Sequence, residues 1–199
     1  MGSNDEAAPV VRINAFPGMG KLTIAREVVQ LYQDRHRQAI LIDNHQLIDP
    51  VEARIPRHHA DYQEQRRLQR AITFSKYLYP PEIRATTIIF TDFRSRNALG
   101  CSVAAEYKNA AAKSARPFLS VYLACDLEEH LQRVATVERR NDGTGKLVDG
   151  EILRSMRSRC ELYTFGAENG LWLDVTHVSP RQAAASIHAY IKAKAYKSE

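Results

Sequence analysis

The chain has 199 residues, of which 44% are hydrophobic, 26% charged and 8% aromatic. This length fits one domain with a sizeable core, and the ordinary composition excludes a collagen, a coiled coil and a largely disordered chain. No apolar run approaches the roughly 18 to 20 residues of a membrane span. The acidic, polar start MGSNDEAAPVV does not resemble a secretory signal, and the three widely spaced cysteines match no zinc or disulfide pattern. We therefore expect a cytoplasmic protein that binds no membrane.

The formal net charge of +5 is compatible with a nucleic-acid ligand and equally with a small phosphorylated ligand. The basic residues are dispersed along the chain and are not interleaved with aromatic residues on a strand. A nucleic-acid-binding surface is usually recognised by clustered basic residues. We therefore expect no nucleic-acid partner. We also expect a monomer or a homodimer.

Hydrophobic patterning predicts strands that alternate with helices. In chain order we expect a loose leader (1–9), a strand (10–15), a helix (21–32), a strand (39–43), a helix (61–79), a strand (86–92), a helix (98–113), a strand (118–124), two helices (127–136 and 151–162), a strand (171–175) and a closing helix (180–195). This alternation predicts βαβ crossovers and a parallel sheet with helices on both faces. Ligands of such sheets bind at the carboxyl ends of the strands.

The helix expected at 61–79 carries an apolar stripe at helical spacing. Its members are Leu68, Ala71, Ile72, Ser75 and Leu78. We expect this stripe to face the core, and the prolines at 80 and 81 to end the helix.

A glycine-rich stretch lies between the first strand and the first helix. Glycines let backbone N–H groups turn inward around phosphate oxygens, and the helix that follows adds its positive dipole end. Lys21 supplies a point charge for the β- and γ-phosphates, and Thr23 can place its hydroxyl on Mg²⁺. We therefore expect the nucleotide to be bound by Pro17, Gly18, Met19, Gly20, Lys21, Leu22 and Thr23.

This stretch meets the pattern G-x-x-x-x-G-K-[ST] imperfectly, because Ala15 replaces the first glycine and Leu22 separates the lysine from the hydroxyl residue. The spacing G-K-x-T resembles the G-x-P-G-x-G-K-G-T loop of adenylate kinases, including its proline at Pro17. The chain as a whole resembles the P-loop kinases of the nucleoside and small-molecule branch, the group of adenylate kinase, shikimate kinase, chloramphenicol phosphotransferase and zeta toxin. It is also similar to uncharacterised ATP-binding proteins with the same G-K-L-T-I-A loop.

The resemblance covers nearly the whole chain in element order, although only the loop is specific at the level of residues. It implies the α/β P-loop NTPase fold, a three-layer sandwich with a five-stranded parallel sheet, helices on both faces and a mobile lid. It also implies one kinase domain over residues 10–199, with ATP and Mg²⁺ as cofactors. The region 44–79 is then expected to form the acceptor side.

Two predicted strands end in a carboxylate. In shikimate kinase and chloramphenicol phosphotransferase an aspartate at the position of Asp43 faces the acceptor hydroxyl, so the resemblance implies that Asp43 orients or deprotonates the acceptor. The alternative is an Asx turn or a helix cap. Asp92 follows an apolar run and either holds Mg²⁺, contacts the substrate or caps a turn.

Further polar residues follow these two strand ends. Arg94 and Arg96 either grip an anionic acceptor or are solvated surface arginines. His45, Asp49 and Arg54 are candidates for the lining of the acceptor pocket.

An arginine-bearing segment follows the fourth strand and its helix, where kinases of this group carry their lid. The resemblance implies a lid at about 133–150, with Arg133 at its entry and Arg139 or Arg140 reaching the phosphates. Such arginines close over ATP and neutralise charge on the transferring group. The alternative is a charged helix end with a flexible loop. The turn at 176–180 is expected to touch the adenine.

The leading hypothesis is an ATP-dependent kinase that transfers a phosphoryl group to a hydroxyl of a small-molecule acceptor, with Lys21, Asp43, Arg133 and Arg139 as catalytic residues. One alternative is a nucleoside or nucleoside-monophosphate kinase, although Phe93-Arg94-Ser95-Arg96 differs from the D-G-F-P-R run of adenylate kinases. Another is a nucleotide-binding regulator with little turnover, which the loss of the first loop glycine would suit.

Overall fold

The structure is a computed structural model that describes residues 7–135, 149–166 and 170–195. It contains one sheet of five parallel strands in the order β2-β3-β1-β4-β5. These strands are β1 (Val10–Asn14), β2 (Ala39–Ile42), β3 (Thr87–Asp92), β4 (Phe118–Ala124) and β5 (Leu171–Asp174). Each begins and ends within one residue of its predicted limits, because each is a short run of mainly apolar residues, β-branched in β1, β2 and β3.

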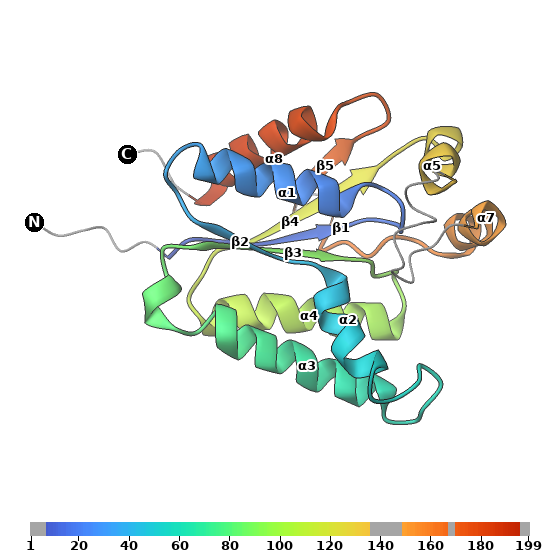
Figure 1. Cartoon of the computed structure of the whole chain (residues 1–199), viewed down its shortest axis with the longest axis horizontal. Helices are drawn as coiled ribbons and strands as arrows, with labels where there is room; N and C mark the ends of the chain where they lie inside the picture. The colour runs from blue at the N-terminus through green and yellow to red at the C-terminus, as the bar shows by residue number, and fades with distance from the viewer. Residues whose placement is uncertain (1–6, 136–148, 167–169, 196–199) are drawn as a thin grey trace, which may run out of the picture.

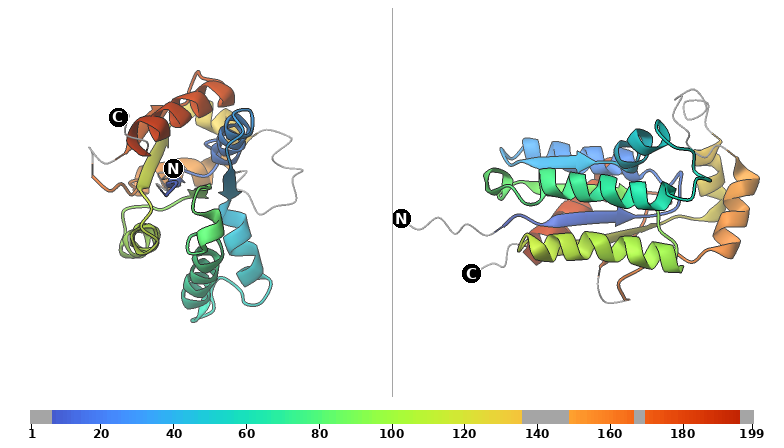
Figure 2. Two further views of the ribbon diagram at one scale, coloured as in Figure 1. Left: turned by 90° about the vertical axis from the view of Figure 1, so that its left-hand side faces the viewer. Right: turned by 90° about the horizontal axis from the view of Figure 1, so that it is seen from below.

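Helices cover both faces of the sheet, as the alternation of elements predicts (Figure 1). One face carries α1 (Lys21–Gln33) and α8 (Pro180–Ala195), and the other carries α2 (Asn44–Glu52), α3 (Tyr62–Tyr77) and α4 (Ala98–Lys113). A short 3₁₀ helix, η1 (Pro81–Ile83), precedes β3. Beyond the carboxyl ends of the strands lie α5 (Leu127–Val134) and α7 (Gly150–Arg159), as Figure 2 also shows.

The core has one apolar cluster on each face of the sheet. Alternation along β1 directs Val11 and Ile13 toward α1 and α8, where they pack with Val28 and Ile187. On the opposite face Ile88, Phe90 and Val10 pack with Phe74, Tyr107 and neighbouring residues of α3 and α4. Arg12 belongs to this second face and is completely buried.

The predicted stripe of α3 is wrong except for its last member, Leu78, which is buried in the core. Leu68 and Ile72 are 40% and 62% exposed, whereas the residues that α3 buries include Arg66, Arg70 and Phe74. The pattern of apolar residues misled because the two arginines find polar partners in the interior. Arg70 forms a paired contact with Glu106 of α4, with nitrogen–oxygen distances of 2.7 and 2.8 Å.

Two further differences concern the segments before β1 and after β2. Ala7 and Ala8 were assigned to a loose leader, but both are buried, and the Ala8 N–H donates to the Arg84 carbonyl at 2.9 Å. Helix α2 was not predicted, since it has nine residues and includes Pro50. Its start nevertheless has a sequence signal, the capping box of Asp43 and Gln46.

In the described ranges, no helix is both long and apolar enough to cross a membrane.

Candidate functional site

The loop between β1 and α1, residues 15–20, is called the glycine-rich loop below. Gly18 and Gly20 have φ angles of 89° and 87°, a backbone region that favours glycine. A Cβ at Gly18 would also overlap the Val134 side chain of α5. The Lys21 ammonium folds back over the loop and donates to the Ala15 and Phe16 carbonyls, both at 2.8 Å. The loop thus has the conformation and the charge that binding phosphate requires.

The replacement of the first loop glycine by Ala15 causes no strain. Ala15 is completely buried and belongs to the core cluster beneath α1. Among the described residues other than glycine, only His36 and Ala115 have a positive φ, so Ala15 lies in an ordinary region. The loop therefore needs glycine at two later positions and tolerates a methyl group at this one.

Helix α5 holds the glycine-rich loop from the side through a buried histidine. The His130 Nε2 atom lies 2.8 Å from the Pro17 carbonyl, and Arg157 of α7 donates to Nδ1 at 3.2 Å. Because an arginine is only a donor, Nδ1 accepts and Nε2 carries the hydrogen, which is the neutral ring. Burial, assisted by the charges of Arg157 and Lys21, lowers the pKa of His130 to about 4 despite the hydrogen bond to Pro17.

Asp43 follows β2 and caps α2. Its Oδ1 accepts from the His45 N–H at 2.7 Å and from the Gln46 N–H at 3.3 Å, and the Gln46 side chain accepts from the Asp43 N–H. The cap alternative is therefore observed. It leaves the second carboxylate oxygen, Oδ2, without a hydrogen bond from the described residues, so capping and contact with an acceptor are compatible.

Asp92 ends β3 and is completely buried between two arginines. Its Oδ1 accepts from the Phe93 N–H at 2.8 Å. Its Oδ2 lies 3.1 Å from Nε of Arg94 and 3.5 Å from Nη2 of Arg12. Burial opposes the charge of Arg94, but Asp92 together with Tyr107 and Glu106 outweighs burial, so the pKa of that guanidinium is raised. Asp92 is therefore held as part of a charge cluster.

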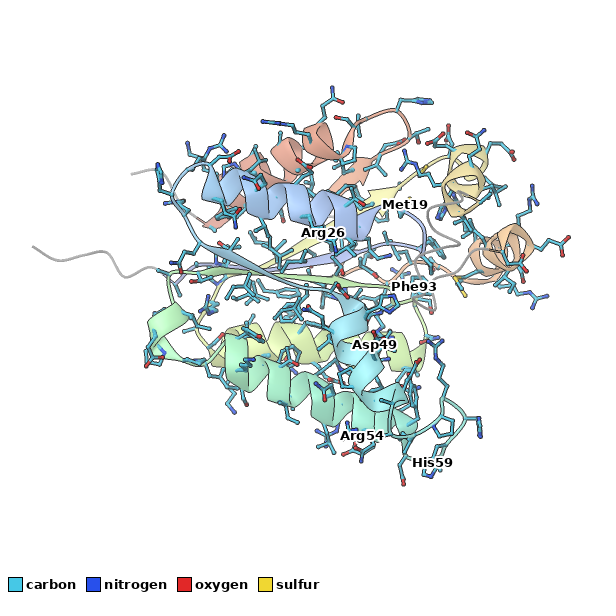
Figure 3. The ribbon with its side chains drawn as sticks, in the orientation of Figure 1. Met19, Arg26, Asp49, Arg54, His59 and Phe93 are labelled. Carbon is cyan, nitrogen blue, oxygen red and sulfur yellow. The ribbon has the colours of Figure 1, made fainter. Side chains whose placement is uncertain are left out.

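Asn14 at the end of β1 organises the loop after β3. Its side chain accepts from the Arg94 N–H at 2.8 Å and donates to the carbonyls of Arg94 and Tyr163 at 3.1 and 2.9 Å. The Phe93 ring packs on Phe16 of the glycine-rich loop, with ring centroids 5.2 Å apart. In Figure 3, Met19 and Phe93 lie at the same end of the sheet, the carboxyl ends of the strands.

The remaining predicted residues divide between this edge and the surface. Arg133 donates to the Val175 and Thr176 carbonyls at 2.6 and 3.0 Å, so it is anchored on the turn expected beside the adenine. Arg96 pairs with Glu161 at the surface. His45 is half-buried near Asp43 and lies 3.3 Å from the exposed Asp49. Arg139 and Arg140 lie outside the described residues.

Figure 3 separates the candidates on the acceptor side. Asp49 lies on α2, whereas Arg54 and His59 lie at the outer end of this layer, away from the sheet. Arg54 donates to the Pro50 carbonyl at 2.9 Å, and His59, which marks the same outer end, accepts at Nδ1 from the Asp61 N–H at 3.1 Å. Arg54 is thus not brought to the carboxylates at the strand ends.

The two predicted magnesium ligands differ in their surroundings. Thr23 lies in the first turn of α1 with an exposed side chain, which fits a cation held by bound phosphates. Asp92 fits less well, because both oxygens already have partners. The described residues contain no group of three or more His, Cys, Asp or Glu side chains that could hold a metal ion.

Comparisons with known proteins identify the fold. No family model and no curated protein matches the sequence. The solved Mycobacterium tuberculosis APS kinase CysC, in complex with AMPPNP and APS, has a TM-score of 0.59 at 15% identity, covering 94% of this chain and 98% of that one. A Sinorhizobium meliloti gluconokinase has a TM-score of 0.61 at 13% identity, covering 96% and 95%. Chaetomium thermophilum Kti12, in complex with ADP-AlF3, has a TM-score of 0.61 at 15% identity, covering 94% and 99%.

These similarities and the five-stranded parallel sheet show that the chain has the α/β P-loop NTPase fold, with P-loop kinases among its structural neighbours. The expected fold class is confirmed. At such low identities the likeness does not extend to substrate or activity.

Sequence reasoning missed three residues of this edge: Arg12, Asn14 and His130. Arg12 had a signal, since a charged residue in the middle of a buried strand requires a partner. Asn14 and His130 had none, because their partners lie 80 to 149 and 113 residues away in the chain.

Proposed function

We propose that this protein is an ATP- and Mg²⁺-dependent kinase that transfers the γ-phosphoryl group of ATP to a hydroxyl of a small-molecule acceptor. The observation that carries the proposal is the glycine-rich loop with its lysine. Two left-handed glycines at the start of α1 and Lys21 above them lie at the same sheet edge as Asp43 and Asp92. Nucleotide and acceptor can therefore meet at one edge.

The nucleotide's phosphates would be held by the loop amides, the first turn of α1 and Lys21. Lys21 now donates to two loop carbonyls, and we expect its ammonium to transfer to the β- and γ-phosphate oxygens when ATP binds. Thr23 would contribute a hydroxyl to Mg²⁺, which neutralises charge on the transferring group. The neighbours with a nucleotide analogue or ADP-AlF3 in their descriptions support this assignment.

The acceptor hydroxyl would be oriented by Asp43 through Oδ2. The capping box holds Oδ1 on the backbone of α2 and so fixes the direction of the carboxylate. Phosphoryl transfer needs mainly positioning, with partial removal of the hydroxyl proton by the aspartate. Asp92 is less suited to this task, because two arginines hold it.

The arginines after α5 complete the proposal. Arg133 would contact the nucleotide from its anchor on the turn after β5. Arg139 and Arg140, which lie outside the described residues, would neutralise the charge that develops on the transferring phosphoryl group. His45 and Arg94 would contact the acceptor.

The test is the transfer of label from γ-labelled ATP, with magnesium, across pooled nucleosides, nucleotides, sugars, carboxylated polyols and amino alcohols. A labelled product from one pool identifies the acceptor class, and label in a nucleoside or nucleotide would favour the alternative kinase. Tight ATP binding without transfer to any pool would contradict the kinase proposal and favour the nucleotide-binding regulator.

The Lys21→Ala variant provides the control for the loop. We expect phosphoryl transfer to fall by about a hundredfold or more, since Lys21 stabilises charge on the transferring group. The fold should remain intact, because Lys21 is only half-buried and the carbonyls of Ala15 and Phe16, to which it donates, belong to the loop. Turnover close to that of the wild type would refute the assignment of the glycine-rich loop.

A further inference from the structure

Arg12 is a buried cation in the middle of β1. It is completely buried, and none of its side-chain nitrogens has a hydrogen-bond partner among the described residues. Its contacts are the Asp92 carboxylate at 3.5 Å and the face of the Tyr107 ring, 5.5 Å from the centroid. Buried guanidinium donors are normally paired, because leaving them unpaired costs free energy.

A second buried arginine, Arg116, shows how a guanidinium with a structural role is hydrogen-bonded in this protein. Arg116 is 4% exposed and donates to four backbone carbonyls, those of Leu78, Ala8, Thr86 and Ile83, at 2.6 to 3.2 Å. Arg116 lies at the amino-terminal end of the sheet. Arg12 is the central residue of β1, but its guanidinium lies 3.5 Å from Asp92, the last residue of β3. The charged group of Arg12 is therefore directed toward the end where a ligand would bind.

The charges around Arg12 do not balance. Arg12 and Arg94 share one carboxylate, that of Asp92. On α3, Arg70 is matched by Glu106, so this pair does not change the balance. Farther along α3, Arg66 is 5% exposed, and its Nε has no hydrogen-bond partner among the described residues. Its other nitrogens contact Asn44 and Tyr62 at more than 3.2 Å, and its charge acts on Glu52.

Tyr107 does not offset this excess. Its hydroxyl has no hydrogen-bond partner within the described part of the chain, and burial raises its pKa, so the phenol stays neutral. This face of the sheet therefore has an excess of positive charge in a region that excludes water, which is where an anion is bound most strongly.

We propose that the acceptor carries an anionic group, a carboxylate, phosphate or sulfate, and that Arg12 and Arg94 bind it beside Asp92. The proposal rests on the proposed function and names the chemical class of its acceptor. Arg12 provides the specificity, because its buried N–H donors gain hydrogen-bond partners only when an anion binds beside them. Arg94 provides the access, since 17% of its side chain is exposed.

The experiment uses thermal unfolding of the full chain and inorganic sulfate as the probe. The protein is first saturated with MgADP, so that the glycine-rich loop is occupied. Sulfate is then titrated at constant ionic strength, because sulfate also stabilises proteins in general. The variants are Arg12→Met and Arg94→Met. Arg26→Met is the matched control, an exposed arginine on α1 and therefore on the opposite layer (Figure 3).

We expect the melting temperature of the wild type and of Arg26→Met to rise with sulfate and to saturate. Arg12→Met and Arg94→Met should weaken the apparent sulfate affinity by about tenfold or more, since each removes charged donors. Without sulfate, Arg12→Met should melt at or above the wild-type temperature, because it removes one of two cations that share Asp92, while Arg94 and the Phe93 N–H still pair that carboxylate.

An equal sulfate response in the wild type and in both arginine variants would overturn the proposal. If Arg12→Met does not fold, Arg94→Met decides alone, because Arg94 is partly exposed. Failure of the proposed function would give a different result, because MgADP would then not raise the melting temperature. In that case the sulfate titrations of the wild type and the variants are compared in nucleotide-free protein, so the anion site is still tested.

Discussion

Asp43 holds the cap of α2 with one carboxylate oxygen and leaves the other without a described hydrogen bond. Its stabilising and catalytic roles can therefore be separated by choosing the substitution. Asparagine caps helices about as well as aspartate but carries no charge and cannot accept a proton from a hydroxyl, whereas alanine loses both properties.

The first prediction concerns Asp43→Asn and Asp43→Ala. Asp43→Asn should keep the free energy of unfolding within a few tenths of a kcal/mol, and Asp43→Ala should lower it by about 1 kcal/mol. Both should reduce transfer to the acceptor by about a hundredfold or more and spare ATP binding. Urea unfolding and γ-label transfer measure the two effects. Normal transfer by Asp43→Asn would show that this aspartate only caps the helix.

His130 links the glycine-rich loop to α5 and α7, and its titration makes the fold sensitive to acid. Its pKa is about 4 in the folded protein, below the usual 6.5 of the unfolded chain. As the pH falls from 6.5 to 4, the unfolded state therefore takes up the proton first, and stability is lost. Above pH 6.5 the full contribution is present.

The second prediction is that His130→Gln flattens this pH dependence. Glutamine can donate to the Pro17 carbonyl and accept from Arg157 but does not titrate in this range. Between pH 7 and 4.5 the wild type should lose about 2 to 3 kcal/mol more than the variant. Urea unfolding at the two pH values measures it. His58→Gln, at an exposed histidine, is the control and should behave like the wild type.

At the scale of elements, the surface of α3 that faces the core includes Phe74 but not the apolar residues Leu68 and Ile72. The Phe74 ring packs on Tyr107 and Phe90 with centroids 5.2 and 5.8 Å apart, while Ile72 points to solvent. Seen from below in Figure 2, α3 and α4 run along the sheet, and Arg70 joins them through Glu106. Polar pairing therefore determines which side of the helix is buried.

The third prediction tests this orientation. Phe74→Ala should lower the free energy of unfolding by about 3 to 5 kcal/mol, because it leaves a cavity among buried aromatic rings. Ile72→Ala should change it by less than about 1 kcal/mol, since most of that side chain is already in water. Urea unfolding of the two variants gives the comparison. The reverse ranking would restore the stripe expected from the sequence.

At the scale of the whole molecule, Arg116 joins segments that are distant in the chain. Its four carbonyl partners belong to the segment before β1, the end of α3, the 3₁₀ helix η1 and the residue before β3. These hydrogen bonds lie at the end of the sheet opposite to the glycine-rich loop, so Arg116 stabilises the fold without contacting the candidate site.

The fourth prediction is that Arg116→Ala lowers the free energy of unfolding by about 3 to 5 kcal/mol, because several buried carbonyls lose a charged donor. ATP affinity of the folded fraction should stay unchanged. Urea unfolding and nucleotide titration measure these two quantities. Arg84→Ala is the control at a neighbouring exposed arginine and should cost under about 1 kcal/mol. A loss below 1 kcal/mol for Arg116→Ala would contradict the assigned role.

The local chemistry of the chain was enough to predict the sheet and the glycine-rich loop. Short runs of apolar residues bounded by polar ones, rich in β-branched residues in β1, β2 and β3, favour strands, and Gly18, Gly20 and Lys21 act through their own backbone and charge. Helix α2 was not predicted because it is short and contains a proline, although its capping box is visible in the sequence.

Only the tertiary structure decided which polar residues would meet inside. Arg12 contacts Asp92, and His130 contacts Pro17, and in both cases the two residues are far apart in the chain. Arg94 is only two residues from Asp92, but the carboxylate that it shares with Arg12 is buried by the fold. Patterns of hydrophobicity place an arginine outside by default, because burying an isolated charge is costly. That default fails where distant carboxylates, rings and carbonyls converge on the charge.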